Sequence, residues 1–214
     1  MHKLATLHTG QAYVVINKPA GINVEKHFDH DTVEARALAE WRRPKATKPP
    51  YVGIVHRLDR PVSGALLLAR NKSTLRLLNK AFEDKLVEKT YVALTEKPLP
   101  KPHGLLQNYL ARDATNRKAV VGTKATHGAK FAELKYRLIE TRTDGHLYEI
   151  IPITGRFHQI RVQLAHAGAP IVGDATYGAE REYQPNAICL HATKLIFPEP
   201  AGEGRVTVES VAKW

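Results

Sequence analysis

The chain has 214 residues, 43% of them apolar and 25% charged, the balance of a globular protein long enough to bury a core without disulfides or structural metal. Its single cysteine, Cys189, excludes an internal disulfide framework, and no apolar stretch approaches the ~20 residues of a membrane span or resembles a signal-peptide core. We therefore expect a cytoplasmic protein that is not secreted and does not span a membrane.

Positive charge is concentrated in two segments. The net charge is +11; residues 42–60 carry six basic residues against one acid, residues 97–130 carry seven against one, and the rest of the chain is balanced. Phosphate contacts favour Lys and Arg because they release counterions, which predicts a nucleic-acid partner; a solvated basic surface is the alternative. The side chains expected at an RNA backbone are Arg42, Arg43, Lys45, Lys48, Arg112, Arg117 and Lys118.

The N-terminal half contains strand and helix signals in alternation. Residues 13–17 form a β-rich run that a turn signal stops at 18–21, and residues 42–50 form a basic loop broken by prolines. Residues 65–69 are an apolar strand candidate. An amphipathic helix follows this strand, and its apolar positions at helical spacing are Leu75, Leu78, Phe82 and Leu86.

The second half contains mainly strand signals. Residues 89–95 predict a strand, and the alternating apolar residues of 134–138 predict a half-solvated antiparallel strand. Its expected partner is 147–153, across a turn at 143–145. The pattern is typical of a sheet built from hairpins.

A helix and two more strands complete the prediction. Apolar residues in 157–167 fall on one helical face, and Gly168 can end that helix in the left-handed conformation. Residues 188–197 and 206–211 predict strands. We expect an α+β fold, in which a mixed, largely antiparallel sheet is flanked by helices and loops and residues 1–214 form one catalytic domain.

Several common functional motifs are absent from the sequence. It has no phosphate loop, dinucleotide fingerprint, nucleophile elbow or paired C-x-x-C, so these classes lose their main support. The cluster at 27–30 contains two histidines and one aspartate in a polar loop. Without further ligands we interpret it as surface, and we expect no metal.

The sharpest local feature is a polar turn before the apolar strand at 65–69. Asp59 is flanked by Arg57 and Arg60, and nearby cations lower the pKa of a carboxyl group and keep it ionised. An anionic aspartate can act as nucleophile or base; a loop salt bridge is the alternative. The H-R-x-D pattern does not indicate a kinase, because the glycine-rich loop and D-F-G are missing.

A second feature lies on the predicted helix at 157–167. His158 and Arg161 are three residues apart and hence neighbours on one helical face. On a rigid helix, this spacing would let Arg161 reach a carboxylate across a cleft. A helix with a polar flank is the alternative.

Taken together, these stretches resemble the RluA-type pseudouridine synthases. Six matches occur in the family's order over nearly the whole chain. They are VINKPAG at 15–21, HRLD at 56–59 with SG at 63–64, KTYVA at 89–93, TGR at 154–156 with HQIR at 158–161, PIVGD at 170–174 with YG at 177–178, and LHA at 190–192.

The resemblance implies a role for individual residues. Asp59 matches the catalytic aspartate, and Arg57 matches the arginine that fills the space left by a flipped-out uridine. Tyr91 matches the tyrosine that lies against the target base, although an aromatic residue in a strand is usually core. Arg161 matches the arginine that pairs with the aspartate. The expected substrate-binding residues are His56, Arg60, His158, Gln159 and Leu195, of which Leu195 is explained equally well by packing.

The resemblance also implies the reaction and the partners. It predicts isomerisation of uridine to pseudouridine in a stem-loop of tRNA or rRNA, by base flipping and without a cofactor. Whether the aspartate attacks C1′, attacks C6 or removes a sugar proton stays open. We expect a monomer without a membrane or obligatory protein partner, in a short form lacking the N-terminal S4 RNA-binding domain. Phe157 departs from the family pattern, which puts the exact substrate in question.

Two alternatives come from other functional classes. The first is a catalytically silent RNA-binding or assembly factor on the same fold, against which the presence of Asp59, Tyr91 and Arg161 argues. The second is a hydrolase that cuts a glycosidic bond. That chemistry usually needs a second carboxylate, and no second acid accompanies Asp59 in its loop.

Overall fold

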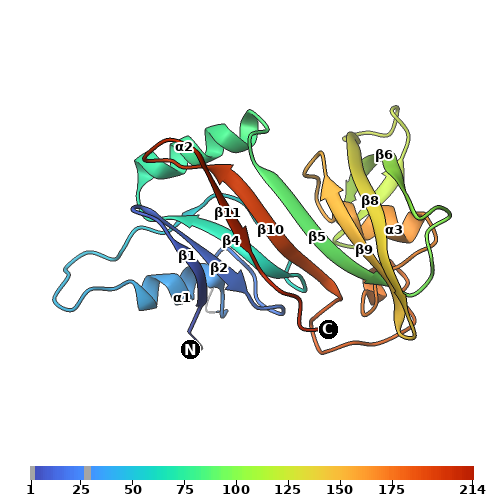
Figure 1. The fold of residues 1–214 in the computed structure, drawn as a ribbon, viewed down its shortest axis with the longest axis horizontal. Helices are drawn as coiled ribbons and strands as arrows, with labels where there is room; N and C mark the ends of the chain where they lie inside the picture. The colour runs from blue at the N-terminus through green and yellow to red at the C-terminus, as the bar shows by residue number, and fades with distance from the viewer. Residues whose placement is uncertain (1–2, 27–29) are drawn as a thin grey trace. The chain divides into compact units, whose positions relative to one another are not determined.

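The computed structural model describes residues 3–26 and 30–214. The chain forms two compact units: unit 1 comprises Met1–Lys89 and Ala192–Lys213, and unit 2 comprises Thr90–His191 with Trp214. Figure 1 shows the elements of both units, coloured from blue at the N-terminus to red at the C-terminus. Each unit contains strands and at least one helix. The first two residues of β5 (Glu88–Thr95) fall in unit 1 and the rest in unit 2, and the first two residues of β10 (Leu190–Pro198) fall in unit 2 and the rest in unit 1.

Unit 1 is built on a twisted set of strands (Figure 1). Within this unit the strands follow the order β1-β2-β4-β10-β11, with β3 pairing β4, and each register given for these pairs is antiparallel. The strands are β1 (Ala5–Thr9), β2 (Tyr13–Lys18), β3 (Gly53–Ile54), β4 (Ser63–Ala69), β10 (Leu190–Pro198) and β11 (Arg205–Glu209); the helices are α1 (Val33–Glu40) and α2 (Lys72–Glu83).

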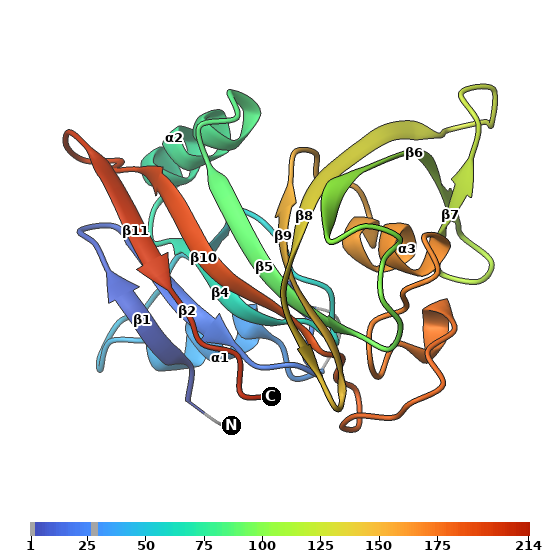
Figure 2. The same ribbon diagram turned by 45° about the vertical axis from the view of Figure 1, so that its right-hand side comes forward.

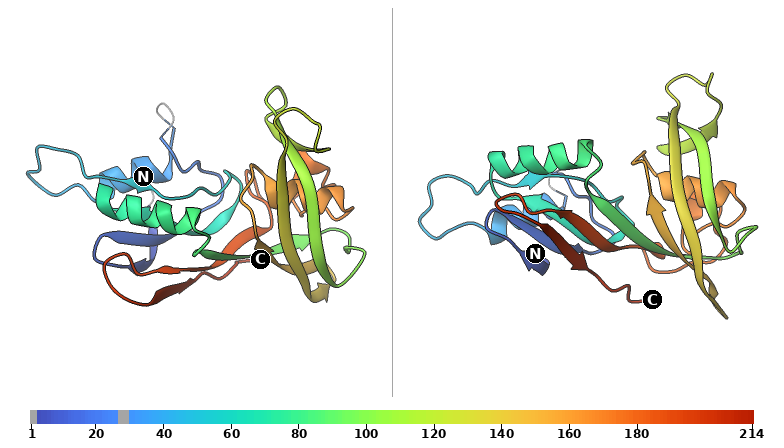
Figure 3. Two further views of the ribbon diagram at one scale, coloured as in Figure 1. Left: turned by 90° about the horizontal axis from the view of Figure 1, so that it is seen from above. Right: turned by 45° about the horizontal axis from the view of Figure 1, so that its top comes forward.

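β4, an almost continuous apolar run, lies in the core of unit 1. Gly64–Ala69 of this strand is buried throughout. Leu78 of α2 packs into a cluster that includes Val15, Leu67 and Phe197, and Figure 3 shows α2 lying over the strands of this unit. The amphipathic helix predicted after β4 is therefore confirmed.

Unit 2 contains the remaining strands and a helix (Figure 2). Its strand order is β5-β9-β8-β6-β7, and every pairing is antiparallel. α3 packs against β6 and β7, and Val162 of this helix shares a core with Leu110, Ala119 and Ala132. The elements are β5 (Glu88–Thr95), β6 (His103–Asp113), β7 (Lys118–Gly122), β8 (Lys130–Arg142), β9 (Gly145–Pro152), α3 (Gln159–His166) and the short 3₁₀ helix η1 (Ala175–Tyr177).

Two helix boundaries differ from the sequence prediction. α2 ends at Glu83, so Leu86 lies beyond the helix and is 51% exposed. α3 begins at Gln159, after His158 in the left-handed conformation at φ 51°, so Phe157 precedes the helix and is not part of its apolar face. The predicted stop is confirmed, since Gly168 has φ +86°.

The predicted α+β class with a largely antiparallel sheet is confirmed, whereas one domain over 1–214 stays a prediction. Among residues 3–26 and 30–214, no helix has the length and apolar character that crossing a membrane requires.

Candidate active site

Asp59 lies half-buried in the loop between β3 and β4. The Val62 amide donates to the Asp59 carbonyl at 3.0 Å, which closes a turn over these residues. The turn after β2 holds the same loop from the other side: the Gly21 amide donates to the Arg60 carbonyl at 2.8 Å, and Arg60 Nε donates to the Gly21 carbonyl at 3.0 Å. The backbone that carries Asp59 is thus fixed in two directions.

Lys18, the last residue of β2, fastens the Asp59 loop from inside. Its side chain is 0% exposed, and Nζ donates to the carbonyls of Val62 at 2.7 Å, Pro19 at 2.9 Å and Arg60 at 3.2 Å. Burial lowers the pKa of Lys18 to about 7, and the negative charge of Asp59 opposes this shift. Lys18 therefore supports the turn that carries Asp59.

His56 anchors the start of the same loop. Its Nε2 accepts a hydrogen bond from the Leu67 amide at 3.1 Å, and its ring stacks on Phe82 at 5.1 Å between ring centroids. Burial, and then the nearby charge of Lys89, lowers the pKa of His56 to about 3, so the ring is neutral at pH 7. This describes a positioning residue; its predicted contact with substrate stays a prediction.

Arg57 and Arg60 are exposed on the solvent side of the loop. The side chain of Arg57 is 69% exposed, and its Nη1 donates to Glu25 Oε2 at 3.0 Å. An exposed pair of this kind is weak, so the guanidinium can exchange this carboxylate for another partner at small cost. The predicted entry of Arg57 into the space of a flipped nucleotide requires such a release.

Tyr91 is supplied by unit 2, where β5 holds it opposite Ile150 of β9. Its side chain is buried. Asp59 belongs to unit 1, and Tyr91 and Arg161 belong to unit 2. Their meeting around one nucleotide therefore stays a prediction.

Arg161 is buried in the first turn of α3 and paired with Asp174. Its Nε donates to Asp174 Oδ2 at 2.7 Å and its Nη2 to Asp174 Oδ1 at 2.8 Å, a bidentate geometry that fixes the guanidinium plane. The guanidinium also lies 5.0 Å from the ring centroid of Tyr177. The sequence predicted Arg161 as the partner of Asp59 and missed Asp174, although the segment at 170–174 was among the matched motifs.

His158 and Gln159 connect Arg161 to the rest of unit 2. His158 Nδ1 lies 2.8 Å from the Tyr177 hydroxyl, so His158 and Arg161 both contact Tyr177. The prediction that they share a helical face is wrong, because His158 precedes α3 in the left-handed conformation. Burial, reinforced by the charge of Arg161, lowers the pKa of His158 to about 4. Gln159 is buried: its Oε1 accepts from Thr154 Oγ1 at 2.8 Å, and its Nε2 donates to the Glu133 carbonyl at 3.0 Å. Gln159 therefore fixes the loop before α3.

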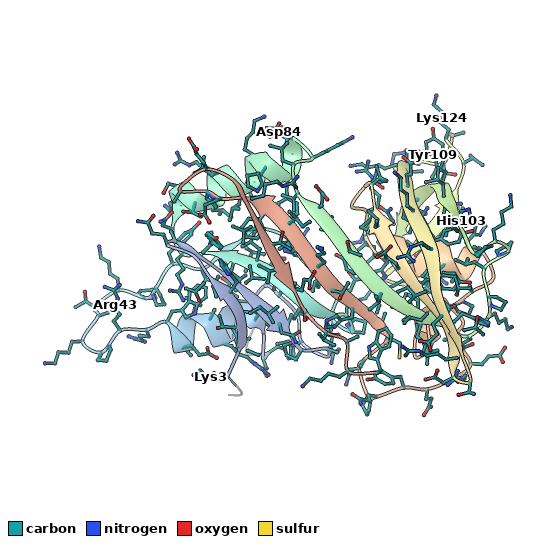
Figure 4. All side chains as sticks on the ribbon, in the orientation of Figure 1. Lys3, Arg43, Asp84, His103, Tyr109 and Lys124 are labelled. Atoms are coloured by element: carbon teal, nitrogen blue, oxygen red, sulfur yellow. The ribbon has the colours of Figure 1, made fainter. Side chains whose placement is uncertain are left out.

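The remaining predicted site residues divide into core and surface. Leu195 is buried in the core cluster of unit 1, as packing alone would explain, and its role in substrate binding stays a prediction. Figure 4 shows Arg43 on a loop that extends from unit 1 and Lys124 on the loop after β7 in unit 2. The predicted backbone contacts are exposed at Arg42, Arg43, Lys45, Lys48, Arg112 and Arg117 and half-buried at Lys118.

The histidine-rich cluster at 27–30 lies largely outside the described residues, which omit 27–29. Within 3–26 and 30–214, the structure contains no group of three or more His, Cys, Asp or Glu side chains that could hold a metal ion.

The folds of solved structures agree with this architecture. A structure named "Human RNA Pseudouridylate Synthase Domain Containing 1" superimposes with a TM-score of 0.79 at 24% identity, over 98% of this chain and 84% of that one. A second, "Human RNA Pseudouridylate Synthase Domain Containing 4", gives a TM-score of 0.78 at 24% identity, over 97% of this chain and 88% of that one. At this identity the likeness concerns the fold.

Sequence comparison establishes the family. Residues 12–166 match the family model described as RNA pseudouridylate synthase, and the chain belongs to this family. It is 34% identical over 198 residues to "Ribosomal large subunit pseudouridine synthase D" of Borreliella burgdorferi, which covers 90% of this chain and 60% of that one. It is 34% identical over 199 residues to "Ribosomal large subunit pseudouridine synthase C" of Vibrio vulnificus, covering 89% and 60%. The chain thus spans about 60% of the length of these curated relatives.

Proposed function

We propose that the chain is an RNA pseudouridine synthase in which Asp59 is the catalytic aspartate. The observation that carries the proposal is the Asp59 loop, fastened by three hydrogen bonds from a buried lysine and located within one of the family's matched segments. A loop held this firmly suits a carboxylate that must keep one position through a reaction.

The proposed reaction is an isomerisation and needs no external reagent. The N1–C1′ bond of uridine breaks, the uracil turns over, and a C5–C1′ bond forms. The hydrogen on C5 is released and N1 gains a proton, so the atoms and electrons balance without a redox partner or net water. A carboxylate, a cation that keeps it ionised and an aromatic wall for the detached base supply what this sequence of steps requires.

We assign the residues as follows. Asp59 acts on the nucleotide, Arg161 braces its charge, and Tyr91 lies against the uracil. Arg57 leaves Glu25 and fills the space of the extruded nucleotide, whose removal from the stack costs a few kcal/mol. The pair between Arg161 and Asp174 supports this assignment, because it fixes the guanidinium before substrate arrives.

The substrate we propose is structured RNA, with large-subunit ribosomal RNA ahead of transfer RNA. The names of the curated relatives, which refer to the ribosomal large subunit, favour this order. Unpaired uridines in loops are the expected targets, since A-form helices hide base edges. We further propose that the chain acts as a monomer. We also propose that it acts in the cytoplasm, where a free, buried thiol such as Cys189 stays reduced.

The substrate is tested with RNA from cells that lack the gene. Purified protein is incubated with total rRNA and tRNA from that strain, and pseudouridines are mapped by their carbodiimide adducts. We expect a small number of new pseudouridines, in rRNA first. If neither RNA gains any pseudouridine, the proposed function is wrong; free uracil in the same incubation would indicate a glycosidic hydrolase.

The role of Asp59 is separated from RNA binding with two variants. Asp59→Ala is expected to abolish pseudouridine formation and largely keep RNA affinity. Asp84→Ala is the matched control, an aspartate in the same unit that pairs with Lys80 at the end of α2, and it should keep both. Full activity in Asp59→Ala would refute the assignment of Asp59 and require another catalytic group.

A further inference from the structure

Phe157, just before α3, is a large aromatic side chain that unit 2 leaves 39% exposed. A single exposed apolar side chain is ordinary, so the informative feature is the arginine held against this ring. Proteins that bind unpaired nucleic acid commonly expose aromatic rings next to Arg or Lys, because every base has a π-face that can stack.

The surroundings of Phe157 match this arrangement. The Arg112 guanidinium, on an exposed side chain of β6, lies 4.8 Å from the centroid of the Phe157 ring. The His158 ring stacks on Phe157 with centroids 3.8 Å apart and planes inclined by 21°. The phenyl ring is therefore held in a defined orientation, with an exposed cation over its face.

A chain of contacts connects this ring to the interior of unit 2. His158 Nδ1 lies 2.8 Å from the Tyr177 hydroxyl, and that hydroxyl accepts from the Ala119 amide at 2.7 Å. Tyr177 also contacts Arg161 through its ring. Phe157 is thus supported by the same residues that position Arg161, and such preorganisation reduces the ordering cost of binding.

We propose that Phe157 and Arg112 form a subsite for one unpaired nucleobase of the RNA. This inference rests on the proposed function. The base stacks on the phenyl ring and takes the place of the guanidinium. Arg112 then moves from the ring to the phosphate of the same nucleotide. Because stacking strength increases with the size of the π-surface, the subsite prefers a purine to a pyrimidine.

The test uses a pair of tryptophan variants and single-stranded RNA decamers of adenylate and of uridylate. Phe157→Trp places a fluorescent ring at the subsite. Phe131→Trp is the matched control, because Phe131 is also in unit 2 and 40% exposed. Relative to the wild type, with its two natural tryptophans, we expect the decamers to quench the fluorescence of Trp at 157 and not at 131. The adenylate decamer should bind more tightly.

Two further variants separate stacking from charge. Phe157→Leu should raise the Kd of the adenylate decamer about fivefold or more and leave the salt dependence unchanged. Arg112→Gln should reduce the slope of log Kd against log salt by about 0.7. If Phe157→Leu fails to fold, as judged by thermal unfolding, the two tryptophan variants still decide.

Equal quenching at positions 157 and 131, no quenching at 157, or an unchanged Kd in folded Phe157→Leu would each overturn the subsite. Pseudouridine formation by the wild type is measured separately. If pseudouridine forms and Trp at 157 is not quenched, the subsite alone is wrong. If Trp at 157 is selectively quenched and no pseudouridine forms, the proposed function alone is wrong.

Discussion

At the scale of single residues, the buried ammonium group of Lys18 both holds the Asp59 loop in place and puts a positive charge near the Asp59 carboxylate. Its ammonium has three N–H donors, and three carbonyl oxygens of the Asp59 loop and the neighbouring turn accept from it. Burial costs this ammonium its solvation, which lowers its pKa to about 7. Lys18 is therefore protonated below pH 7 and loses its proton just above it.

This titration predicts an alkaline limit on activity. As the pH rises through about 7, Lys18 becomes neutral, one donor of the loop is lost, and Asp59 loses a nearby positive charge. We expect kcat/KM to fall over this range in the wild type. In Lys18→Met, kcat should be about tenfold lower at pH 6 and the alkaline fall should be absent.

Lys80→Met is the control for a surface lysine of the same unit and should keep the wild-type profile. If folded Lys18→Met shows the same fall in kcat/KM at alkaline pH as the wild type, the fall is caused by the titration of another group.

The sequence singled out Asp59, the proposed catalytic aspartate, but not the residue that supports its loop. Asp59 could be singled out because two arginines flank it in the chain. Lys18 lies 41 positions earlier, and only the pairing of β2 with β4, which places Lys18 opposite Gly64, brings it to this loop. A contact of this kind depends on strand register, which single-sequence patterns do not specify.

At the scale of elements, α3 and η1 are joined by a buried ion pair. Arg161 and Asp174 have side chains 5% and 1% exposed, so replacing the carboxylate removes a bidentate countercharge from a buried guanidinium. Asp174→Asn is expected to reduce the free energy of unfolding by about 3 kcal/mol, measured by urea denaturation. Pseudouridine formation should fall with it, because Arg161 loses its fixed orientation.

Glu149→Gln provides the comparison. Glu149 pairs with Arg137 in the same unit, but Arg137 is 61% exposed, and this substitution should change stability little. Equal stability of Asp174→Asn and Glu149→Gln would contradict a supporting role for the buried pair.

The basic loop after α1 is predicted to bind the RNA backbone. Replacing Arg42, Arg43, Lys45 and Lys48 by Gln removes four exposed charges. We expect weaker RNA binding, with turnover at saturating RNA retained. The slope of log Kd against log salt should fall by about 0.7 for each phosphate that the loop no longer neutralises.

The control removes the same charge from α2 and the turn after it, by replacing Lys72, Arg76, Lys80 and Lys85, which are also exposed in unit 1. If both sets reduce the salt slope equally, the loop has no special contact with RNA.

Element prediction succeeded where the pattern was regular and failed where it was not. The alternation in 134–138 identified β8, whose Leu134 and Tyr136 are buried. β6 and β7 were not predicted, because Gly104 and the polar residues of 107–108 interrupt the first strand and basic residues surround the second. β7 pairs with β6, and β6 pairs with β8, through contacts between strands that propensity alone does not predict.

At the scale of the whole molecule, both the charge and the proposed catalytic residues are divided between the two units. The basic segment 42–60 belongs to unit 1 and 97–130 to unit 2, and Asp59 likewise belongs to unit 1 whereas Tyr91 and Arg161 belong to unit 2. If these residues act together, one RNA must engage both units. The α+β class followed from hairpin-like periodicity, while the division into units depends on long-range contacts that the sequence does not display.

Release of tritium from rRNA labelled at C5 of uridine tests the central claim most directly. Forming the C5–C1′ bond expels the C5 hydrogen, whereas RNA binding or simple hydrolysis of the glycosidic bond leaves it in place. We predict that the wild type releases tritium into water without liberating uracil, and that Asp59→Ala releases none. Absence of tritium release by the wild type, or equal release by both proteins, would contradict the account.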